Sequence, residues 1–97
     1  MSDQLSDMSR ELMLDGNAAA GILQEIFGEE MTASPIECAH CGAIGELGTL
    51  MAFTQGPGIV LRCQICEGVI LRLVETPSAF LLDARGAVYL RIRRNNL

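Results

Sequence analysis

The sequence contains no tryptophan and few other aromatic residues. Three phenylalanines and one tyrosine are present among 97 residues, at Phe27, Phe53, Phe80 and Tyr89. The core must therefore be aliphatic, built from leucine, isoleucine, valine, alanine and methionine. A chain of this length forms one small domain and buries only about 60 to 65% of the surface that its unfolded form exposes. Such a core is marginal by itself and requires further stabilisation.

Long apolar runs are also missing. No stretch approaches the ~18 to 20 apolar residues that a membrane-spanning helix needs. The first residues lack a basic region followed by an apolar run, so we expect no signal peptide and no membrane association. A cytoplasmic location is therefore expected.

Positive charge is scarce in the first half of the chain. Residues 1–46 contain nine acidic residues and a single basic one, Arg10, whereas residues 47–97 contain three acidic residues and six arginines. The two halves carry −8 and +3, which together give the net charge of −5. The whole chain thus lacks the general attraction to nucleic acid of a basic domain, and any polyanion contact has to use the C-terminal half.

Groups for acid–base or nucleophilic catalysis are few. His40 is the only histidine, and no Ser/His/Asp set, phosphate-binding glycine loop or carboxylate pair stands out. General acid–base catalysis depends on such positioned groups. We therefore expect a protein that is not an enzyme.

The four cysteines, in contrast, form two pairs with identical internal spacing. Cys38-Ala39-His40-Cys41 and Cys63-Gln64-Ile65-Cys66 are separated by residues 42–62. Two residues between paired cysteines allow a tight turn, here called a knuckle, to aim both sulfurs at one point. Two knuckles side by side supply four thiolates in a tetrahedron. The spacing predicts a zinc ribbon, in which one structural zinc ion is bound by Cys38, Cys41, Cys63 and Cys66.

Other uses of the cysteines are less favoured. Iron in a rubredoxin-like centre takes the same four ligands, so spacing alone leaves iron open. The scarcity of aromatic residues that could shield a redox centre favours zinc. A thiol redox role is typical of one Cys-x-x-Cys pair at a helix start, whereas this chain has two pairs among short strands. A closed site with four cysteines has no open position for substrate, which indicates a structural role.

Residues next to the cysteines are expected to support the site. His40 lies between two ligands that belong to a complete set, so it is expected to be an exposed bystander. Gly42 and Gly68 follow the two knuckles, where a positive φ is expected and glycine tolerates it. Cysteines that bind metal and form no disulfide are typical of a reducing compartment.

The N-terminal part of the chain predicts one helix. Residues 1–13 are polar and acidic and are expected to form a flexible tail. A weak amphipathic helix is the alternative, because Leu5, Met8 and Leu12 have helical spacing. Ala18, Ile22, Leu23, Ile26 and Phe27 then lie on one apolar stripe, which predicts a helix over residues 16–27 that docks on its own sheet. Asp15 or Asn17 can cap its start, and Gly28 can cap its end.

The remainder predicts short β-strands. Alternation, β-branched residues and turn residues indicate strands over residues 44–55, 59–62, 69–76, 79–83 and 87–93. Residues 14–94 are expected to form a single zinc-ribbon domain, and residues 95–97 a short tail. The expected fold class is small α+β, a zinc-ribbon type antiparallel sheet with one N-terminal helix.

The last strand carries the best candidates for partner contacts. Tyr89, Arg91 and Arg93 alternate with Val88, Leu90 and Ile92, and Arg72 could join them. Arginines beside an aromatic ring can contact phosphates and stack on bases. A solvated outer strand face is the simpler interpretation of the same residues.

Several motifs together resemble a known family. The run from Leu14 to Gly21 (LDGNAAAG), the knuckle CAHCG, the stretch LRCQIC and the segment LRLVETP look like a family of short bacterial zinc-ribbon proteins of unknown function. The similarity covers residues 14–92. It implies the fold and the four cysteine ligands, and it implies no activity.

These observations favour a non-enzymatic adaptor that binds a protein partner, with zinc holding the scaffold. The apolar helix and the acidic N-terminal half are the expected contact surface. A nucleic-acid-associated ribbon that acts through the Tyr/Arg face is the alternative, with weak binding expected. A one-electron carrier or a metal-handling protein is a third hypothesis.

Overall fold

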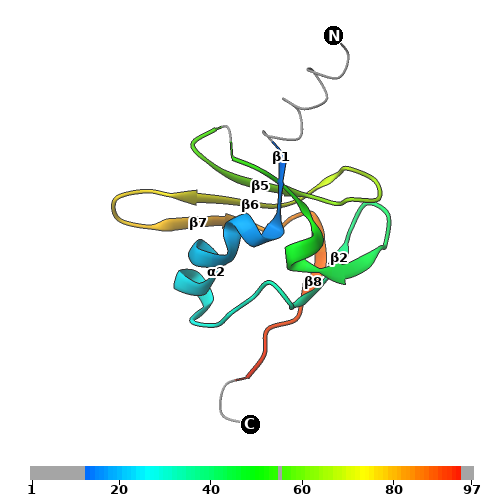
Figure 1. Cartoon of the computed structure of the whole chain (residues 1–97), viewed down its shortest axis with the longest axis horizontal. Coiled ribbons are helices and arrows are strands. Elements are labelled where there is room, and N and C mark those ends of the chain that lie inside the picture. Colours follow the sequence, from blue (N-terminus) through cyan, green and yellow to red (C-terminus); the bar gives the residue numbers. More distant parts are fainter. Residues whose placement is uncertain (1–12, 55, 95–97) are drawn as a thin grey trace.

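Two antiparallel sheets make up most of the fold (Figure 1). The computed structural model describes residues 13–54 and 56–94. The larger sheet has the order β1-β4-β5-β6-β7, and the smaller has the order β3-β2-β8. The strands of the larger sheet are β1 (Met13–Asp15), β4 (Met51–Phe53), β5 (Gly58–Arg62), β6 (Val69–Glu75) and β7 (Phe80–Asp83). Those of the smaller sheet are β2 (Pro35–Cys38), β3 (Ile44–Glu46) and β8 (Ala87–Leu90). The predicted α+β class with antiparallel sheets is confirmed.

The helical segment after β1 matches the predicted range. It consists of a 3-10 turn, η1 (Gly16–Ala19), followed directly by α2 (Ala20–Phe27). The Asp15 carboxylate caps the start by accepting a hydrogen bond from the Asn17 N–H at 3.1 Å. Gly28 ends the helix in the left-handed conformation, with φ of 72°. Both predicted caps are thus present.

The apolar side of this segment packs on the protein's own core. Leu23 is fully buried, and Ile22, Ile26 and Phe27 pack against the core cluster. Ala18, which was expected on the stripe, is exposed, and Ala19 is buried in its place. The first turn is a 3-10 turn with three residues per turn, so the side-chain directions differ from those of an α-helix.

A close backbone contact anchors the start of the helical segment. A Cβ atom on Gly16 would lie 2.0 Å from the carbonyl oxygen of Leu47, in a second 3-10 turn, η2 (Leu47–Thr49). The N–H of Gly48 in the same turn donates to the Thr32 carbonyl at 2.7 Å. Glycine at position 16 therefore allows η1 and η2 to touch backbone to backbone.

The prediction of one continuous strand over residues 44–55 is wrong. The turn η2 divides this stretch into β3 and β4, which belong to different sheets. The later predicted strands appear as β5, β6, β7 and β8, although β8 ends at Leu90 and not at Arg93. The strands β1 and β2 lie outside the predicted ranges. Local sequence patterns did not indicate them because each is held by its neighbours in a sheet.

The core between the elements is aliphatic, as predicted. None of the four aromatic residues belongs to the fully buried set. Two of the cysteines, Cys38 and Cys63, are members of the core cluster. The buried apolar residues are Ala19, Leu23, Met31, Ile36, Cys38, Leu47, Leu50, Ala52, Leu61, Cys63, Ile70, Leu71 and Leu73. The cysteine site is therefore continuous with the hydrophobic core.

The two predicted tails lie almost entirely outside the described residues. Of the expected tail over residues 1–13, residues 1–12 lie outside the described part, and Met13 begins β1 opposite Phe53. Residues 95–97 also lie outside the described part. Among residues 13–54 and 56–94, no helix has the length and apolar character needed to cross a membrane.

Candidate metal centre

The two knuckles share one backbone hydrogen-bond pattern. In each, the residue after the second cysteine donates its N–H to the carbonyl of the first cysteine, at 2.8–2.9 Å. The first cysteine in turn donates its N–H to the carbonyl five residues later, at 2.9 Å. One knuckle follows β2 and the other follows β5, so strands of different sheets bring the knuckles together.

Left-handed backbone occurs at one equivalent position of each knuckle. The residue after the second cysteine has a φ of 79° at Gly42 and 65° at Glu67. The expectation that Gly68 takes the positive φ is therefore wrong, because Glu67 takes it in the second knuckle. Gly68 is needed for space, since a Cβ atom there would lie 2.5 Å from the His40 ring.

The four sulfur atoms form a compact cluster. All four lie within 4.8 Å of one another. The Sγ atoms of Cys38 and Cys66 are 3.7 Å apart, and so are those of Cys41 and Cys63. A tetrahedron with metal–sulfur bonds of about 2.3 Å has sulfur–sulfur edges of about 3.8 Å. A disulfide needs about 2.05 Å, so the cluster has the dimensions of a metal site and contains free thiols.

Backbone N–H groups are directed at the sulfur atoms. Three such contacts of 3.4 Å connect His40 N–H with Cys38, Ile65 N–H with Cys63, and Gly68 N–H with Cys66. Four thiolates around a divalent ion carry a net charge of −2, and N–H dipoles reduce the cost of that charge. The backbone of both knuckles thus supports a charged centre.

The thiols have divergent proton affinities. Burial raises the pKa of Cys63, but the N–H groups of Cys66 and Ile65 outweigh burial and lower this pKa to about 7. The N–H of Ala43 lowers the pKa of Cys41, whereas desolvation and the neighbouring sulfurs raise it to about 12. One thiolate forms readily, and the next is opposed by the first. A bound cation would favour the thiolate form of the cysteines.

His40 lies outside the ligand cluster and connects the two knuckles. Its Nε2 atom is 2.9 Å from the carbonyl oxygen of Val69, the first residue of β6. The ring covers Gly68, which follows the second knuckle. Sequence reasoning placed His40 as an exposed residue, which it is, but could not indicate this contact because its partner is a backbone group 29 positions away.

The cluster offers ligands at four positions, and among residues 13–54 and 56–94 no His, Asp or Glu side chain joins it. One cysteine of each knuckle is buried and the other is exposed, so the site lies at the edge of the core. A bound ion with four thiolates has no vacant coordination position, and such sites cross-link a fold. The arrangement can therefore tie β2 to β5, and with them the two sheets.

The predicted partner-binding residues are divided between the sheets. Tyr89 is in β8 of the smaller sheet, and Arg91 and Arg93 follow that strand. Arg72 is in β6 of the larger sheet, opposite Asp83. Tyr89 pairs across the sheet with Glu37, so an acidic side chain shares its face. The structure brings together Arg91 and Arg93 and places Arg72 on the other sheet.

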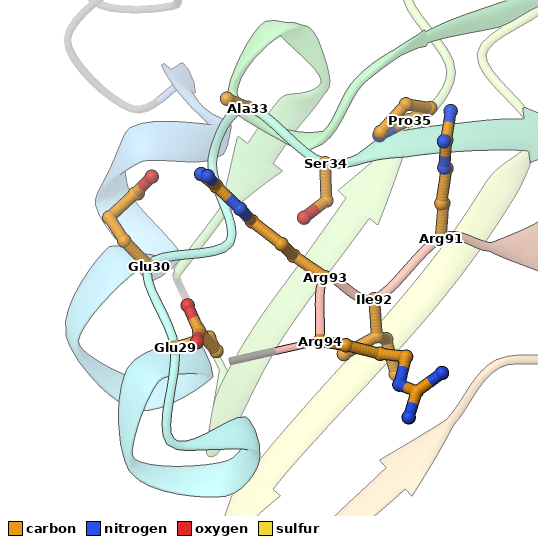
Figure 2. Close-up of a pocket in the computed structure, with 9 residues that line it drawn as sticks. All are labelled: Glu29, Glu30, Ala33, Ser34, Pro35, Arg91, Ile92, Arg93 and Arg94. Carbon is orange, nitrogen blue, oxygen red and sulfur yellow. The ribbon is translucent and has the colours of Figure 1, made fainter. Parts of the chain in front are cut away.

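A groove lies beside these arginines (Figure 2). It has a volume of about 850 Å³ and runs between the connector after α2 and the segment after β8. The Arg91 N–H donates to the Pro35 carbonyl at 2.9 Å and fixes the two walls together. The lining residues are Glu29, Glu30, Ala33, Ser34, Pro35, Arg91, Ile92, Arg93 and Arg94. Sequence reasoning missed this groove because its walls are more than 50 residues apart in the chain.

Charges of opposite sign line the two walls of the groove without pairing. Figure 2 shows the Arg93 side chain directed towards the connector, while Arg91 and Arg94 point to opposite ends. Within the described residues, the single ion pair joins Asp83 and Arg85, so no groove arginine pairs with Glu29 or Glu30. The Glu30 carboxylate already accepts hydrogen bonds from the N–H and the hydroxyl of Thr32. Glu29 and the three arginines have no ion-pair partner among the described residues and are available to a bound molecule.

Comparison with known proteins places the chain in a family. Residues 8–95 match a family of unknown function, DUF6510. The chain belongs to this family. The match includes both knuckles and all described residues, so the expected resemblance to a family of unknown function is confirmed. No curated protein and no solved structure matches the chain.

Proposed function

We propose that this protein is a non-enzymatic, cytoplasmic adaptor of the zinc-ribbon type, with one structural zinc ion and a groove for a segment of a protein partner. The mixed-charge groove between the connector and the C-terminal segment carries this proposal. It presents three arginines and two glutamates that are not paired with each other.

The cysteine cluster supports zinc as the resident ion. Four sulfur atoms within 4.8 Å of one another, two pairs of them 3.7 Å apart, suit a tetrahedral ion that needs no other ligand. The buried pair, Cys38 and Cys63, belongs to the hydrophobic core, so the ion stabilises the fold and is no transient cargo. Structural zinc contributes on the order of 10 kcal/mol or more to folding. Metal analysis and the visible spectrum distinguish zinc from iron, because oxidised iron–thiolate sites absorb visible light.

The charge pattern of the groove favours a protein over a nucleic acid. Glu29 and Glu30 on one wall would repel a phosphate backbone that approached the arginines on the other. Glu37 beside Tyr89 acts in the same way on the neighbouring face. A peptide segment carries both signs of charge and can satisfy both walls, which gives specificity.

The helix is the weaker candidate for the contact surface. Leu23 of α2 is fully buried, and its apolar neighbours on the same stripe pack on the core. What remains of α2 at the surface is mainly polar, with Gln24 and Glu25 exposed. The groove therefore replaces the helix as the surface to test.

Crosslinking from within the groove tests the proposal. A photo-reactive residue in place of Ala33 on the groove wall should attach to a partner protein, identified by mass spectrometry. The same residue in place of Ala84, an exposed turn residue after β7, serves as the control and should not attach to it. Arg93→Glu should reduce the crosslink by about 10-fold, since it places a third carboxylate in the groove. Arg72→Glu makes the same change of charge on the other sheet and should leave the crosslink unchanged.

A binding assay with nucleic acid separates the two functional hypotheses. We expect no change in the fluorescence anisotropy of a labelled single-stranded RNA at about 0.15 M salt. Tight binding that is lost in Arg93→Glu would instead assign the groove to nucleic acid. A crosslink from Ala33 that is insensitive to Arg93→Glu would also contradict the proposal.

A further inference from the structure

The outer strand of the larger sheet is apolar and unprotected. β7 is the last strand in the order β1-β4-β5-β6-β7. Its residues Phe80, Leu81 and Leu82 are 37%, 56% and 40% exposed. Figure 1 shows the hairpin of β6 and β7 extending to one end of the molecule, with β7 at the margin of the sheet.

Edge strands normally carry features that prevent pairing with other chains, such as proline, lysine or a bulge. β7 has none of them, because its sequence is Phe-Leu-Leu-Asp and its register with β6 is regular. Its one charged residue, Asp83, forms an ion pair with Arg85 at 2.8 Å. The other edge strands are less suited to pairing with a further strand. β1 and β3 have three residues each, and β8 pairs with β2 through a register shift.

The direction of the β7 backbone groups follows from the hairpin turn. The N–H of Thr76 donates to the carbonyl of Ala79 at 2.8 Å, so these residues form a hydrogen-bonded pair. Hydrogen-bonded and non-hydrogen-bonded pairs alternate along an antiparallel ladder. The next pair, Glu75 with Phe80, is therefore non-hydrogen-bonded, and so is Leu73 with Leu82. The N–H and C=O groups of Phe80 and Leu82 thus point away from β6, to the open edge.

The sequence of β7 is complementary to itself in one register. If Leu81 of two copies lies on a two-fold axis, Phe80 of each copy is opposite Leu82 of the other. These two residues have the outward backbone groups, so both hydrogen-bonded pairs form. Asp83 is then opposite Ala79, and no like charges meet. If the axis passed through Phe80 or Leu82 instead, the three apolar residues of one copy would no longer all lie opposite apolar residues of the same three in the other copy.

We propose that β7 pairs with β7 of a second copy of this chain, antiparallel and centred on Leu81, to form a continuous sheet across a two-fold dimer. The interface is small, and the dimer therefore exchanges with monomers. It leaves the groove near Arg93 free, so it is independent of the adaptor function proposed above.

Sedimentation of the full, zinc-loaded chain tests the dimer. Its weight-average mass should rise from that of a monomer towards that of a dimer over a range of about 1 to 500 µM. Leu81→Lys should remain monomeric, because two ammonium groups would meet on the axis. Val88→Lys is the matched control, since Val88 is 58% exposed in β8 of the other sheet, and it should dimerise like the wild type. Zinc content and circular dichroism check that both variants fold.

Mixing variants tests the register itself. Leu81→Glu alone should also be monomeric, whereas an equimolar mixture of Leu81→Lys and Leu81→Glu should dimerise. This rescue is expected only if residue 81 faces its own counterpart across the axis. A wild type that stays monomeric throughout, a Leu81→Lys variant that dimerises normally, or a mixture that stays monomeric would each overturn the proposal. A mixture that stays monomeric would contradict the β7–β7 dimer even if β7 paired with a strand of a different protein.

Discussion

The Nε2 atom of His40 donates a hydrogen bond to the carbonyl oxygen of Val69 at 2.9 Å. Since a carbonyl oxygen can only accept, Nε2 carries a proton in this contact. The bond connects the first knuckle with the residue that begins β6, just beyond the second knuckle. The only histidine of the chain thus joins the two knuckles of the candidate metal centre from outside the sulfur cluster.

His40→Ala is expected to retain one metal ion per chain and to lower the free energy of unfolding by about 1 kcal/mol. The four thiolates stay in place, but the link between the knuckles is lost. Metal analysis and denaturant unfolding measure the two effects. Ile65→Ala changes the equivalent position of the second knuckle, which is 71% exposed, and should alter neither. A large loss of metal in His40→Ala would make the histidine a ligand.

Glu67→Gly is expected to stabilise the protein by about 1 kcal/mol. Glu67 has a φ of 65°, a left-handed conformation that costs a residue with a Cβ atom about 1 to 2 kcal/mol and that glycine adopts freely. Gly42→Glu introduces the same cost at the equivalent position of the first knuckle and should destabilise by a similar amount. Thermal unfolding of the metal-loaded variants compares them. Equal melting temperatures of Glu67→Gly and the wild type would argue against strain at this position.

Gly16→Ala is expected to destabilise the fold by several kcal/mol. The added methyl group would meet the Leu47 carbonyl at 2.0 Å, and a backbone atom can give way only if η1 separates from η2. Gly21→Ala is the control within α2, where a Cβ atom meets nothing within 4 Å, and should stabilise by about 0.5 to 1 kcal/mol. Denaturant unfolding should move the two variants in opposite directions. Similar stability of both would contradict the close contact.

Removal of the metal with a strong chelator is expected to abolish cooperative thermal unfolding. Cys38 and Cys63 belong to the buried core, so loss of the ion leaves repelling or protonated thiols inside it. Cys63→Ser should have the same effect, and added zinc should restore the chelated wild type but not the variant. Calorimetry measures the transition. A metal-free protein that melted like the metal-loaded one would show that the ion is not structural.

Each knuckle of the cysteine site could be predicted from the sequence because its geometry is local, whereas the meeting of the two knuckles depends on strands of different sheets. Two residues between cysteines determine a tight turn whatever surrounds it, and the four sulfurs indeed lie within 4.8 Å of one another. The helix caps at Asp15 and Gly28 were predictable for the same reason, since each depends on a few neighbouring residues. An aliphatic core followed directly from composition.

Contacts between distant segments were decided by the tertiary structure alone. Residues 44–55 were predicted as one strand, but the turn η2, whose Leu47 carbonyl lies against Gly16, divides them between two sheets. The positive φ lies at Glu67 and not at Gly68, and the His40 ring from the other knuckle occupies the space above Gly68. The groove near Arg93 and the open edge of β7 arise from strand order. No local pattern encodes strand order, because it depends on which apolar faces can be buried together.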